Sequence, residues 1–509
     1  MPEPELETAA APVFASSNEM EPFDYLMFRT ELDPHSRSAG VEVEILDRVP
    51  DWERFREAFD RASRVVVRLR QKVVVPTLAV ATPRWVVDPD FDLDYHVRHI
   101  AVPPPGTMRQ VLDLAITIVE APLDTARALW EVALVEGLEG GRAALITKMS
   151  HAVTDGLGGM QLVKHIYDEE RDPPRRPLSP LPIPEDVTPQ DLTRHTMRRL
   201  PVSLAQTAAR GVSTLVGTVG RSLRDPAKSI SGAAAFVRSA RRMFAAPPVE
   251  PSPLLRRRSL SSRLEGHEVP IEALRRAGKT AGCSVNDAYI AAVCAVLRRY
   301  HEALGVPVEA LPMAIPISLR TDDDPAGGNR FAGARLRAPV GEEDPVERMW
   351  LIREQVLAAR SEPAIGAMTL LAPVLSRVPA SMLTALNGLT SSTDVQASNI
   401  PGDPKPRYIG GARVVREVAA GPLPGVAMMF VLISLEGTGY ISVRYDTASV
   451  TEFDVFARCL REGFDEVVAV GDAGASPEDE TPRNGKARTS KATTKATAQS
   501  RTATAKKAM

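Results

Sequence analysis

A histidine and an aspartate stand four residues apart where an apolar run gives way to a helical pattern. His151 follows the run 143–147, Asp155 comes after it, and three glycines lie between 156 and 159. A neutral imidazole near pH 7 can take a proton from a hydroxyl and give it to a leaving group. A loop that leaves a buried strand would hold this side chain rigidly, and the glycines would let a substrate approach the backbone. His151 is therefore a candidate general base.

Patterns that would supply His151 with a protein nucleophile, a metal or a phosphate loop are missing nearby. There is no G-x-S-x-G turn, no second histidine at i+4 and no G-x-x-x-x-G-K-[ST] loop. His151 would thus act alone on a hydroxyl brought by the substrate, and we expect no metal. The same spacing also fits a buried histidine held by hydrogen bonds, with Asp155 as an ordinary helix cap. Because H-x-x-x-D is common by chance, spacing alone leaves both interpretations open.

Composition describes an ordinary globular protein of more than one domain. The chain has 509 residues, of which 44% are hydrophobic, and a formal net charge of -2, so charge recommends no particular partner. Its three cysteines form neither a disulfide framework nor a paired metal spacing, which fits a reducing compartment. The N-terminal stretch lacks the features of a secretory signal, and no run of about 18 apolar residues occurs. We therefore expect a cytoplasmic protein without a transmembrane helix, for which contact with a membrane surface stays open.

Changes in composition divide the chain into five segments. We expect a disordered acidic N-terminus, a compact domain containing His151, a proline-rich linker with a basic amphipathic helical segment, a second compact domain and a disordered basic tail. Their boundaries are 1–20, 21–172, 173–254, 255–472 and 473–509. In the second domain a helix is expected to start near Ser284 or Asn286, and the turn at Glu436–Gly439 predicts a hairpin.

The basic segment and the tail raise the question of a polyanionic partner. Residues 191–246 could form a helix that lies on an anionic membrane, or one that covers a neighbouring domain and turns its basic face to solvent. Beyond residue 480 the tail carries only basic charge. It could bind anionic lipid or nucleic acid, although a solubilising tail without a single partner is the simpler interpretation. No basic patch is interleaved with aromatic residues, so we expect no nucleic-acid partner.

The histidine motif resembles the signature of a known enzyme family. Residues 150–156 read S-H-A-V-T-D-G, which is similar to the H-H-x-x-x-D-G signature of the bacterial wax ester synthase/acyl-CoA:diacylglycerol acyltransferase family. That family is grouped with CoA-dependent acyltransferases such as chloramphenicol acetyltransferase and peptide-synthetase condensation domains. The second histidine of the signature, which is the family's catalytic base, is present as His151. Ser150 stands in place of the first histidine.

Further blocks of the same family follow in the same order along the chain. They are matched by 83–106, by A-L-W-E at 128–131, by N-D at 286–287, by I-P-I-S-L-R at 315–320 with G-N-R at 328–330, and by S-N-I-P-G at 398–402. In the second of these blocks, Ala128 replaces the family's proline. Each block is weak alone, but their number and order make the resemblance extensive.

The resemblance implies an α/β fold of two chloramphenicol-acetyltransferase-like domains, with the active-site channel at their interface. It also implies a long-chain acyl-CoA as co-substrate, no bound cofactor, and diacylglycerol or a long-chain alcohol as the acceptor. His151 would be the catalytic base. The protein would work peripherally at a membrane or lipid-droplet surface, which would give the basic segment a purpose.

By the same resemblance, other motif residues support the site. The expected supporting residues are Asp155, Gly156, Asn286, Asp287 and Arg320, and the expected substrate-channel residues are Ser150, Trp130 and Glu131. Asp155 would be structural and would pair with Arg320. Asn286 would help to hold the site across the domain interface, or would simply cap its helix. Trp130 would pack the wall of the channel.

Two other functions stay open. A condensation-type enzyme of this fold would take its acyl group from a carrier protein, although the absence of adjoining synthetase domains disfavours it. A catalytically weak lipid-binding or lipid-droplet scaffold would keep the channel without the chemistry, although the retention of His151, Asp155 and Gly156 together argues against it. If the first histidine of the signature influences acceptor choice, Ser150 would alter the acceptor more than the type of reaction.

Overall fold

The computed structural model describes residues 18–78, 81–154, 159, 164–198, 249–318, 329, 331–362, 367–378 and 393–473. The chain divides into two units, 1–473 and 474–509, and all the described residues belong to the first. Three segments for which the sequence predicts disorder or a basic helix, 1–17, 199–248 and 474–509, lie outside the described residues.

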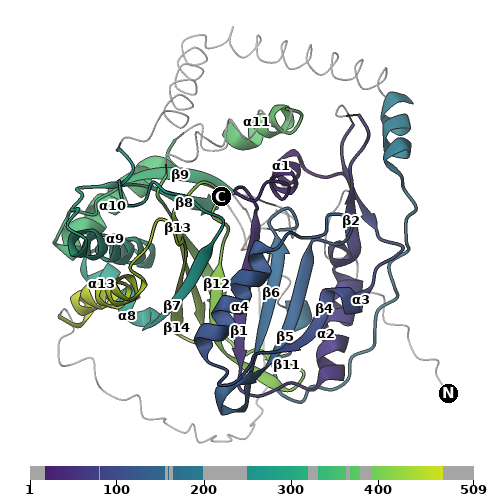
Figure 1. The fold of residues 1–509 in the computed structure, drawn as a ribbon, viewed down its shortest axis with the longest axis horizontal. Helices are drawn as coiled ribbons and strands as arrows, with labels where there is room; N and C mark the ends of the chain where they lie inside the picture. The colour runs from purple at the N-terminus through teal and green to yellow at the C-terminus, as the bar shows by residue number, and fades with distance from the viewer. Residues whose placement is uncertain are drawn as a thin grey trace, which may run out of the picture. The chain divides into compact units, whose positions relative to one another are not determined.

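Six strands form the first sheet, and the strand that ends beside His151 lies in its interior (Figure 1). Their order is β11 (Tyr408–Ile409), β12 (Ala412–Ala420), β1 (Ala39–Leu46), β6 (Arg142–Ser150), β5 (Trp130–Leu138) and β4 (Val97–Ala101). β4 and β5 run parallel, and the other neighbouring pairs are antiparallel. Because β6 has hydrogen-bonded neighbours on both sides, its end is firmly placed.

A helix covers each face of this sheet. α2 (Trp52–Val65), capped by Asp51, packs on one face, and α4 (Met108–Glu120), capped by Thr107, packs on the other. Successive side chains of a strand point to opposite faces. The β1 residues that pack with α4 are Val41, Val43 and Ile45. The intervening β1 residues Gly40, Glu42 and Glu44 therefore lie on the α2 side.

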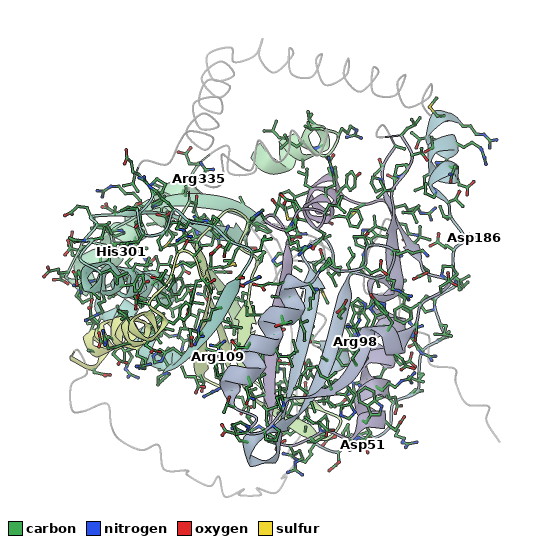
Figure 2. The ribbon with its side chains drawn as sticks, in the orientation of Figure 1. Asp51, Arg98, Arg109, Asp186, His301 and Arg335 are labelled. Carbon is green, nitrogen blue, oxygen red and sulfur yellow. The ribbon has the colours of Figure 1, made fainter. Side chains whose placement is uncertain are left out.

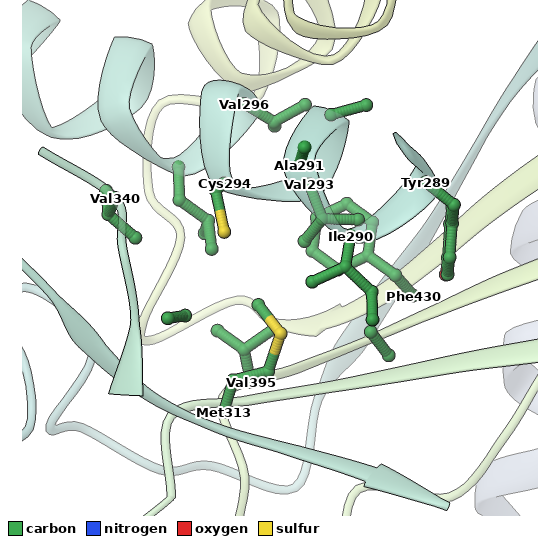
Figure 3. Packing of buried hydrophobic residues seen from close by; sticks show 14 of the residues in the cluster. Tyr289, Ile290, Ala291, Val293, Cys294, Val296, Met313, Val340, Val395 and Phe430 are labelled. Carbon is green, nitrogen blue, oxygen red and sulfur yellow. The ribbon is translucent and has the colours of Figure 1, made fainter. Parts of the chain in front are cut away.

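The second sheet also has six strands and shares one core with four helices. Its order is β7 (Ser262–Pro270), β14 (Thr438–Asp446), β13 (Met428–Leu435), β10 (Val395–Asp403), β8 (Leu311–Ser318) and β9 (Phe331–Ala338). The helices are α8 (Ile271–Thr280), α9 (Val285–Ala303), α10 (Pro345–Arg360) and α13 (Phe453–Ala473). The core includes Tyr289, Ile290, Val293 and Cys294 of α9, which face Met313, Val395 and Phe430 of the sheet (Figure 3). α9 is thus the central helix of this half.

Shorter elements complete the described fold. They are α1 (Pro22–Thr30), η1 (Val67–Arg70), β2 (Gln71–Val74), β3 (Arg84–Val87), α3 (Leu93–His96), η2 (Glu139–Gly141) and α11 (Ala367–Leu375), and residues 164–166 and 189–198 are helical as well. β2 and β3 form a two-stranded antiparallel sheet. α1 packs with α11 and, as shown below, carries two acidic side chains to the candidate site.

The two halves of the chain are joined by strand exchange. β11 and β12 come from the part predicted to form the second domain, yet they complete the first sheet, where β12 pairs with β1. Arg109 of α4, labelled in Figure 2, adds a bond between the halves, because its Nη1 donates to Leu264 O of β7 at 2.8 Å. Boundaries drawn from composition cannot show such an exchange, since strand pairing depends on contacts between distant residues.

The predicted hairpin is confirmed. β13 and β14 are antiparallel neighbours, with Leu435 opposite Thr438. The two turn residues, Glu436 and Gly437, have φ values of 48° and 87°. Positive φ at both positions is what a tight two-residue hairpin turn requires.

The proline-rich segment after the first domain crosses the surface of that domain in an extended form. Residues 173–188 contain no helix or strand. Arg64 Nη1 donates to Ser179 O at 3.1 Å, and Glu185 N donates to Val87 O at 3.1 Å. At the other end of the domain, Trp85 N donates to Asn18 O at 2.8 Å. Residues 18–20, which belong to the segment expected to be disordered, therefore contact this domain.

Within the described helices, none is by itself long and apolar enough to cross a membrane. α8 and α9 reach the required length and composition only as a pair, and the chain bends by 98° between them. α9 is buried in the core of the second half.

Candidate functional site

His151 occupies the first position after β6, in a turn that backbone hydrogen bonds fix from two sides. Its N–H donates to Ser38 O at 3.3 Å, and the N–H of Ser150 donates to Leu129 O at 3.0 Å. Val153 N donates back to Ser150 O at 3.0 Å and closes the turn. Ser38 and Leu129 directly precede β1 and β5, the two neighbours of β6. The sheet therefore sets the position of the histidine backbone.

The imidazole of His151 lies against the backbone of Gly40 on β1. A methyl group at Gly40 would stand 3.5 Å from Cε1 and 4.0 Å from Nδ1 of the ring. Because glycine has no side chain, β1 can pass this close to the imidazole. His151 is half-buried, so part of the residue stays exposed while its backbone is held.

A side chain from a distant segment also holds His151. Asn329, which lies just before β9, uses its Nδ2 to donate both to the carbonyl oxygen of His151 and to Oδ1 of Asp24, the latter at 2.9 Å. The backbone N–H of Asn329 donates to the same Oδ1 at 3.2 Å. Since Asp24 belongs to α1, three segments that are far apart in the sequence meet behind the candidate base.

Burial raises the pKa of Asp24 from 3.8 to about 6. The hydrogen bonds from Asn329 and the positive charge of Arg68 oppose this rise, and Glu21 adds to it. Arg68 lies over the ring of Trp85, with its guanidinium carbon 4.2 Å from the ring centroid, and burial lowers its pKa to about 10. Asp24 therefore changes charge close to neutral pH, and the strength of its bonds to Asn329 changes with it.

Ser150, which replaces the first histidine of the family signature, is buried and bound to an acidic side chain. Its hydroxyl donates to Oε1 of Glu31 at 2.7 Å and accepts from Ala152 N at 3.2 Å. Glu31 stands at the C-terminal cap of α1 and also accepts from the Ser38 hydroxyl at 2.8 Å. Ser150 therefore ties the end of β6 to the end of α1, directly beside His151.

Three of the predicted site residues lie outside the described residues. They are Asp155, Gly156 and Arg320. Their roles, including an ion pair between Asp155 and Arg320, stay predictions. The same holds for the active-site channel, because the loops that follow His151 and β8 are largely outside the described part of the chain.

Trp130 and Glu131 lie on opposite faces of β5. Trp130 is a core residue on the α2 side, where its Nε1 donates to Leu69 O at 2.8 Å and its ring stacks on His96 at 4.7 Å between centroids. Glu131 pairs at 3.3 Å with Arg98 of β4, which Figure 2 labels. None of these three contacts is made to His151, so a channel role for either residue stays a prediction.

Asn286 and Asp287 open α9, but the helix cap is their neighbour Ser284. The Ser284 hydroxyl accepts from Asp287 N at 3.2 Å, and the Asp287 carboxylate accepts from Ser284 N at 2.8 Å. The alternative in which Asn286 caps the helix is therefore wrong, because this reciprocal pair already fills that position. Oδ1 of Asn286 instead lies 3.5 Å from Nδ2 of Asn399, at the outer limit of a hydrogen bond. The N-D and S-N-I-P-G blocks thus meet in space.

A group of three carboxylates, two of them buried, lies further along β1, on the same face as Gly40. Glu42 and Glu44 approach Glu417 of β12, and one carboxylate oxygen from each lies within 4.8 Å of the others. Nη2 of Arg407 lies 2.7 Å from Glu417 and 3.2 Å from Glu44, and the Tyr167 hydroxyl donates to Glu44. Burial raises the pKa of Glu44 to about 7 and that of Glu417 well above its usual value. Such oxygens could hold a cation, but Arg407 already supplies the positive charge.

Sequence reasoning identified His151 but missed the residues that hold it. Glu31 is 119 positions from Ser150, and Asp24 is 305 positions from Asn329. Neither acidic residue belongs to a motif block, and the G-N-R block contained Asn329 without naming a partner. A signal did exist for the buried glutamates, because two of them alternate with valines in G-V-E-V-E and so must share one face of a strand.

Two sequence profiles of one family match the chain. The wax ester synthase/diacylglycerol acyltransferase catalytic domain matches residues 11–289, and the C-terminal domain of the same family matches 327–467. A relative from Mycobacterium tuberculosis H37Rv (Rv2484c), provisionally named a diacylglycerol O-acyltransferase, is 51% identical over 461 residues, which covers 91% of this chain and 94% of the relative. Another from the same strain with the same provisional assignment (Rv3087) is 28% identical over 462 residues, covering 86% and 94%.

Solved structures show the same fold. The wax ester synthase/diacylglycerol acyltransferase from Marinobacter aquaeolei VT8 matches with a TM-score of 0.59 and 20% identity, over 89% of this chain and 100% of that one. The first condensation domain of the CDA synthetase matches with a TM-score of 0.54 and 15% identity, over 92% and 99%. At these identities the likeness concerns the fold alone. The predicted α/β fold of the chloramphenicol-acetyltransferase type is confirmed.

Proposed function

Since the chain belongs to the wax ester synthase/diacylglycerol acyltransferase family and is an acyltransferase, we propose that it transfers a long-chain acyl group from acyl-CoA to diacylglycerol, and also to long-chain alcohols. His151 is the proposed general base. The observation that carries the proposal is the placement of His151, whose backbone is held by the sheet and by Asn329 while its imidazole stands beside the bare backbone of Gly40.

The proposed reaction needs one base and no bound cofactor. The imidazole of His151 takes the proton of the acceptor hydroxyl while the hydroxyl oxygen attacks the thioester carbonyl. The resulting tetrahedral intermediate collapses, its C–S bond breaks, and the CoA thiolate recovers the proton from the imidazolium of His151. The products are an ester and free CoA. Holding both substrates against one base turns a chance encounter into a positioned reaction, and a general base contributes about 100- to 10,000-fold to the rate.

The acceptors also bear on where the enzyme works. Diacylglycerol and long-chain alcohols partition into membranes, so we propose that the reaction takes place at a membrane or lipid-droplet surface. If anionic lipid attracts the basic segments of the chain, presenting diacylglycerol in anionic vesicles should raise the rate over neutral vesicles at low salt, where such attraction is strongest.

The proposal is tested by supplying the purified full chain with palmitoyl-CoA and either diacylglycerol or hexadecanol. Release of the CoA thiol and formation of the ester are measured together. His151→Ala should lower ester formation by about 100- to 10,000-fold, because the general base is lost. His99→Ala is the matched control, since His99 is a partly exposed histidine of β4 that pairs with Glu136. It should leave the rate unchanged.

The outcomes separate the candidate functions. Ester formation that depends on His151 supports the proposal, and the ratio of the two products identifies the preferred acceptor. Activity that survives His151→Ala in a folded protein would rule out His151 as the base. If the folded wild-type protein forms no ester from either acceptor, the acyl-CoA donor is wrong, and acyl-loaded carrier protein is the next donor to supply.

A further inference from the structure

We propose that Asn329 and Asp24 are positioning residues for the acyl transfer, which fix the peptide carbonyl of His151 and thereby the direction of its imidazole. This inference rests on the proposed function for its kinetic consequences. Its structural part stands on the three segments that meet behind His151.

The geometry defines how the carboxamide of Asn329 is oriented. Its nitrogen side faces two acceptors, the carbonyl oxygen of His151 and Oδ1 of Asp24. Only the NH2 end of a carboxamide can donate, and it has two hydrogens, one for each acceptor. If the group were flipped, its oxygen would face two other oxygens without a hydrogen between them. The carboxamide of Asn329 is therefore a bridge of fixed polarity from Asp24 to His151.

Asp24 fixes Asn329 in turn. Its Oδ1 accepts from both the side chain and the backbone N–H of Asn329, at 2.9 Å and 3.2 Å. Asp24 is buried, and hydrogen bonds to an ionised acceptor are roughly twice as strong as neutral ones. Together these bonds leave the carboxamide little freedom, so the carbonyl that it holds is equally restrained.

Restraint of this carbonyl acts on the catalytic ring through one peptide. The N–H of His151 is already held by Ser38 on the other side of the residue. With the carbonyl held as well, both peptide groups that flank the Cα of His151 are fixed. The direction of the Cα–Cβ bond, from which the imidazole extends, is then fixed too. Misplacing a reacting group by about 1 Å can cost roughly 100-fold in rate.

The charge of Asp24 gives the bridge a dependence on pH. The charged groups that act on Asp24 are Arg68 of η1 and Glu21 at the start of α1, and Asn329 is its hydrogen-bonding partner. With a pKa of about 6, Asp24 is ionised above this pH and binds Asn329 most strongly there. Below it the carboxyl is protonated and the bridge weakens. The acid side of the pH–rate profile should therefore contain a contribution from Asp24.

Exchanging the side chains of Asp24 and Asn329 distinguishes a role in positioning His151 from a role in stability alone. Asn329→Asp removes the donor to His151 and also places two carboxyl groups side by side. In the double variant Asp24→Asn/Asn329→Asp the carboxamide moves to position 24, where it can donate to the new carboxylate at position 329. That carboxylate still cannot donate to His151. The double variant therefore restores the contact between α1 and the segment before β9, but it does not restore the hydrogen bond to His151.

The experiment compares wild type, Asp24→Asn, Asn329→Asp, the double variant and Gln355→Ala. Gln355 is the matched control, because its carboxamide also donates to a backbone carbonyl, that of Arg337 at 2.9 Å, on a different part of the fold. For each protein we would measure the melting temperature, kcat and KM for acyl-CoA, the pH–rate profile, and the 13C NMR signal of the His151 ring, which is identified by its loss in His151→Ala.

For a positioning role, Asn329→Asp should lower kcat by about 10- to 100-fold with little change in KM, and should shift the His151 signal. The double variant should regain the melting temperature while kcat stays low. In Asp24→Asn the inflection that Asp24 adds to the pH–rate profile near pH 6 should disappear, because the carboxyl that titrates there is gone. Gln355→Ala should change neither kcat nor the signal.

Two results would overturn the inference. Recovery of kcat in the double variant would mean that the pair only joins α1 to the rest of the fold. An unmoved His151 signal in Asn329→Asp would mean that the carboxamide does not set the ring. If wild type shows no acyl transfer but the His151 signal still responds to Asn329→Asp, the proposed function fails while the positioning of His151 by Asn329 stands.

Discussion

At the scale of single residues, Ser150 differs from the histidine of the family signature, yet its side chain is buried and hydrogen-bonded. The serine is buried, and its hydroxyl binds the Glu31 carboxylate at 2.7 Å. The other oxygen of Glu31, Oε2, is buried without a hydrogen-bond partner in the described part of the chain. The carboxylate thus depends on Ser150 and Ser38 for its hydrogen bonds. Ser150 is a structural link next to the proposed base.

Ser150→Ala tests this link. The variant leaves a buried carboxylate with one hydroxyl partner fewer, and such a loss costs about 1–3 kcal/mol. We expect the free energy of unfolding, measured with urea, to fall by that amount. Ser261→Ala is the control, because Ser261 is exposed and should change stability by less than about 0.5 kcal/mol. Equal stabilities of the two variants would contradict a structural role for Ser150.

At the scale of elements, the start of α9 shows that neighbouring motif residues can have different tasks. Ser284 and Asp287 form the reciprocal cap of the helix, which leaves Asn286 to face Asn399 of β10. β10 itself is shaped by Gly402, where a methyl group would stand 1.3 Å from Ser434 O. The glycine of the S-N-I-P-G block is therefore required by the close approach of β13, and no catalytic task is needed to explain it.

Alanine substitutions at the start of α9 should separate these tasks. Ser284→Ala removes the N-cap hydroxyl, so the free energy of unfolding should fall by about 1 kcal/mol. Asn286→Ala leaves the cap intact and should cost less than half as much. Denaturant titration of both variants measures the difference. A larger loss for Asn286→Ala would show that its contact with Asn399 contributes more than the 3.5 Å separation indicates.

At the scale of the whole molecule, the group formed by Glu42, Glu44 and Glu417 joins the two halves of the chain. The first two come from β1, and the third comes from β12, which the second half contributes to the first sheet. Glu44 and Glu417 are buried and share Arg407 as their cationic partner, and Glu42 lies half-buried beside them. Because one positive charge cannot balance three negative ones, the fold favours keeping a proton on the group.

This proton makes stability depend on pH. The pKa of Glu44 is about 7 in the fold against 4.5 for the ordinary side chain, so between these values the native state binds more protons than the unfolded chain. The free energy of unfolding must then decrease as the pH rises through this window, by roughly 3 kcal/mol. Below the window both states are protonated, and above it both are ionised, so the contribution levels off.

Glu42→Gln should weaken this dependence. The variant removes one negative charge and places an amide donor where it can bind the carboxylate of Glu417. We would measure the melting temperatures of the variant and of wild type at about pH 5 and about pH 8, which lie on either side of the pKa of Glu44 in the fold. The gain in melting temperature of the variant over wild type should be larger at about pH 8. Glu354→Gln on the exposed side of α10 controls for the loss of a surface charge. A difference from wild type that is the same at both pH values would contradict proton sharing in this group.

Local patterns in the sequence were sufficient for several features. The position of His151 at the end of an apolar run, the start of α9 near Ser284, and the hairpin turn at Glu436–Gly439 follow from residues close together in the chain. Helix caps, strand alternation and tight turns depend on neighbouring residues, so a single sequence can reveal them. The resemblance across motif blocks added the fold and the type of reaction.

Tertiary structure alone decided what surrounds His151. That Asn329 and Asp24 meet behind His151, that Glu31 binds Ser150, and that β12 joins the first sheet are all contacts between distant parts of the chain. The residue types do not predict the partners, because a carboxylate or a carboxamide can form hydrogen bonds with many different groups. Such contacts are selected by how whole elements pack, and packing depends on every buried side chain at once.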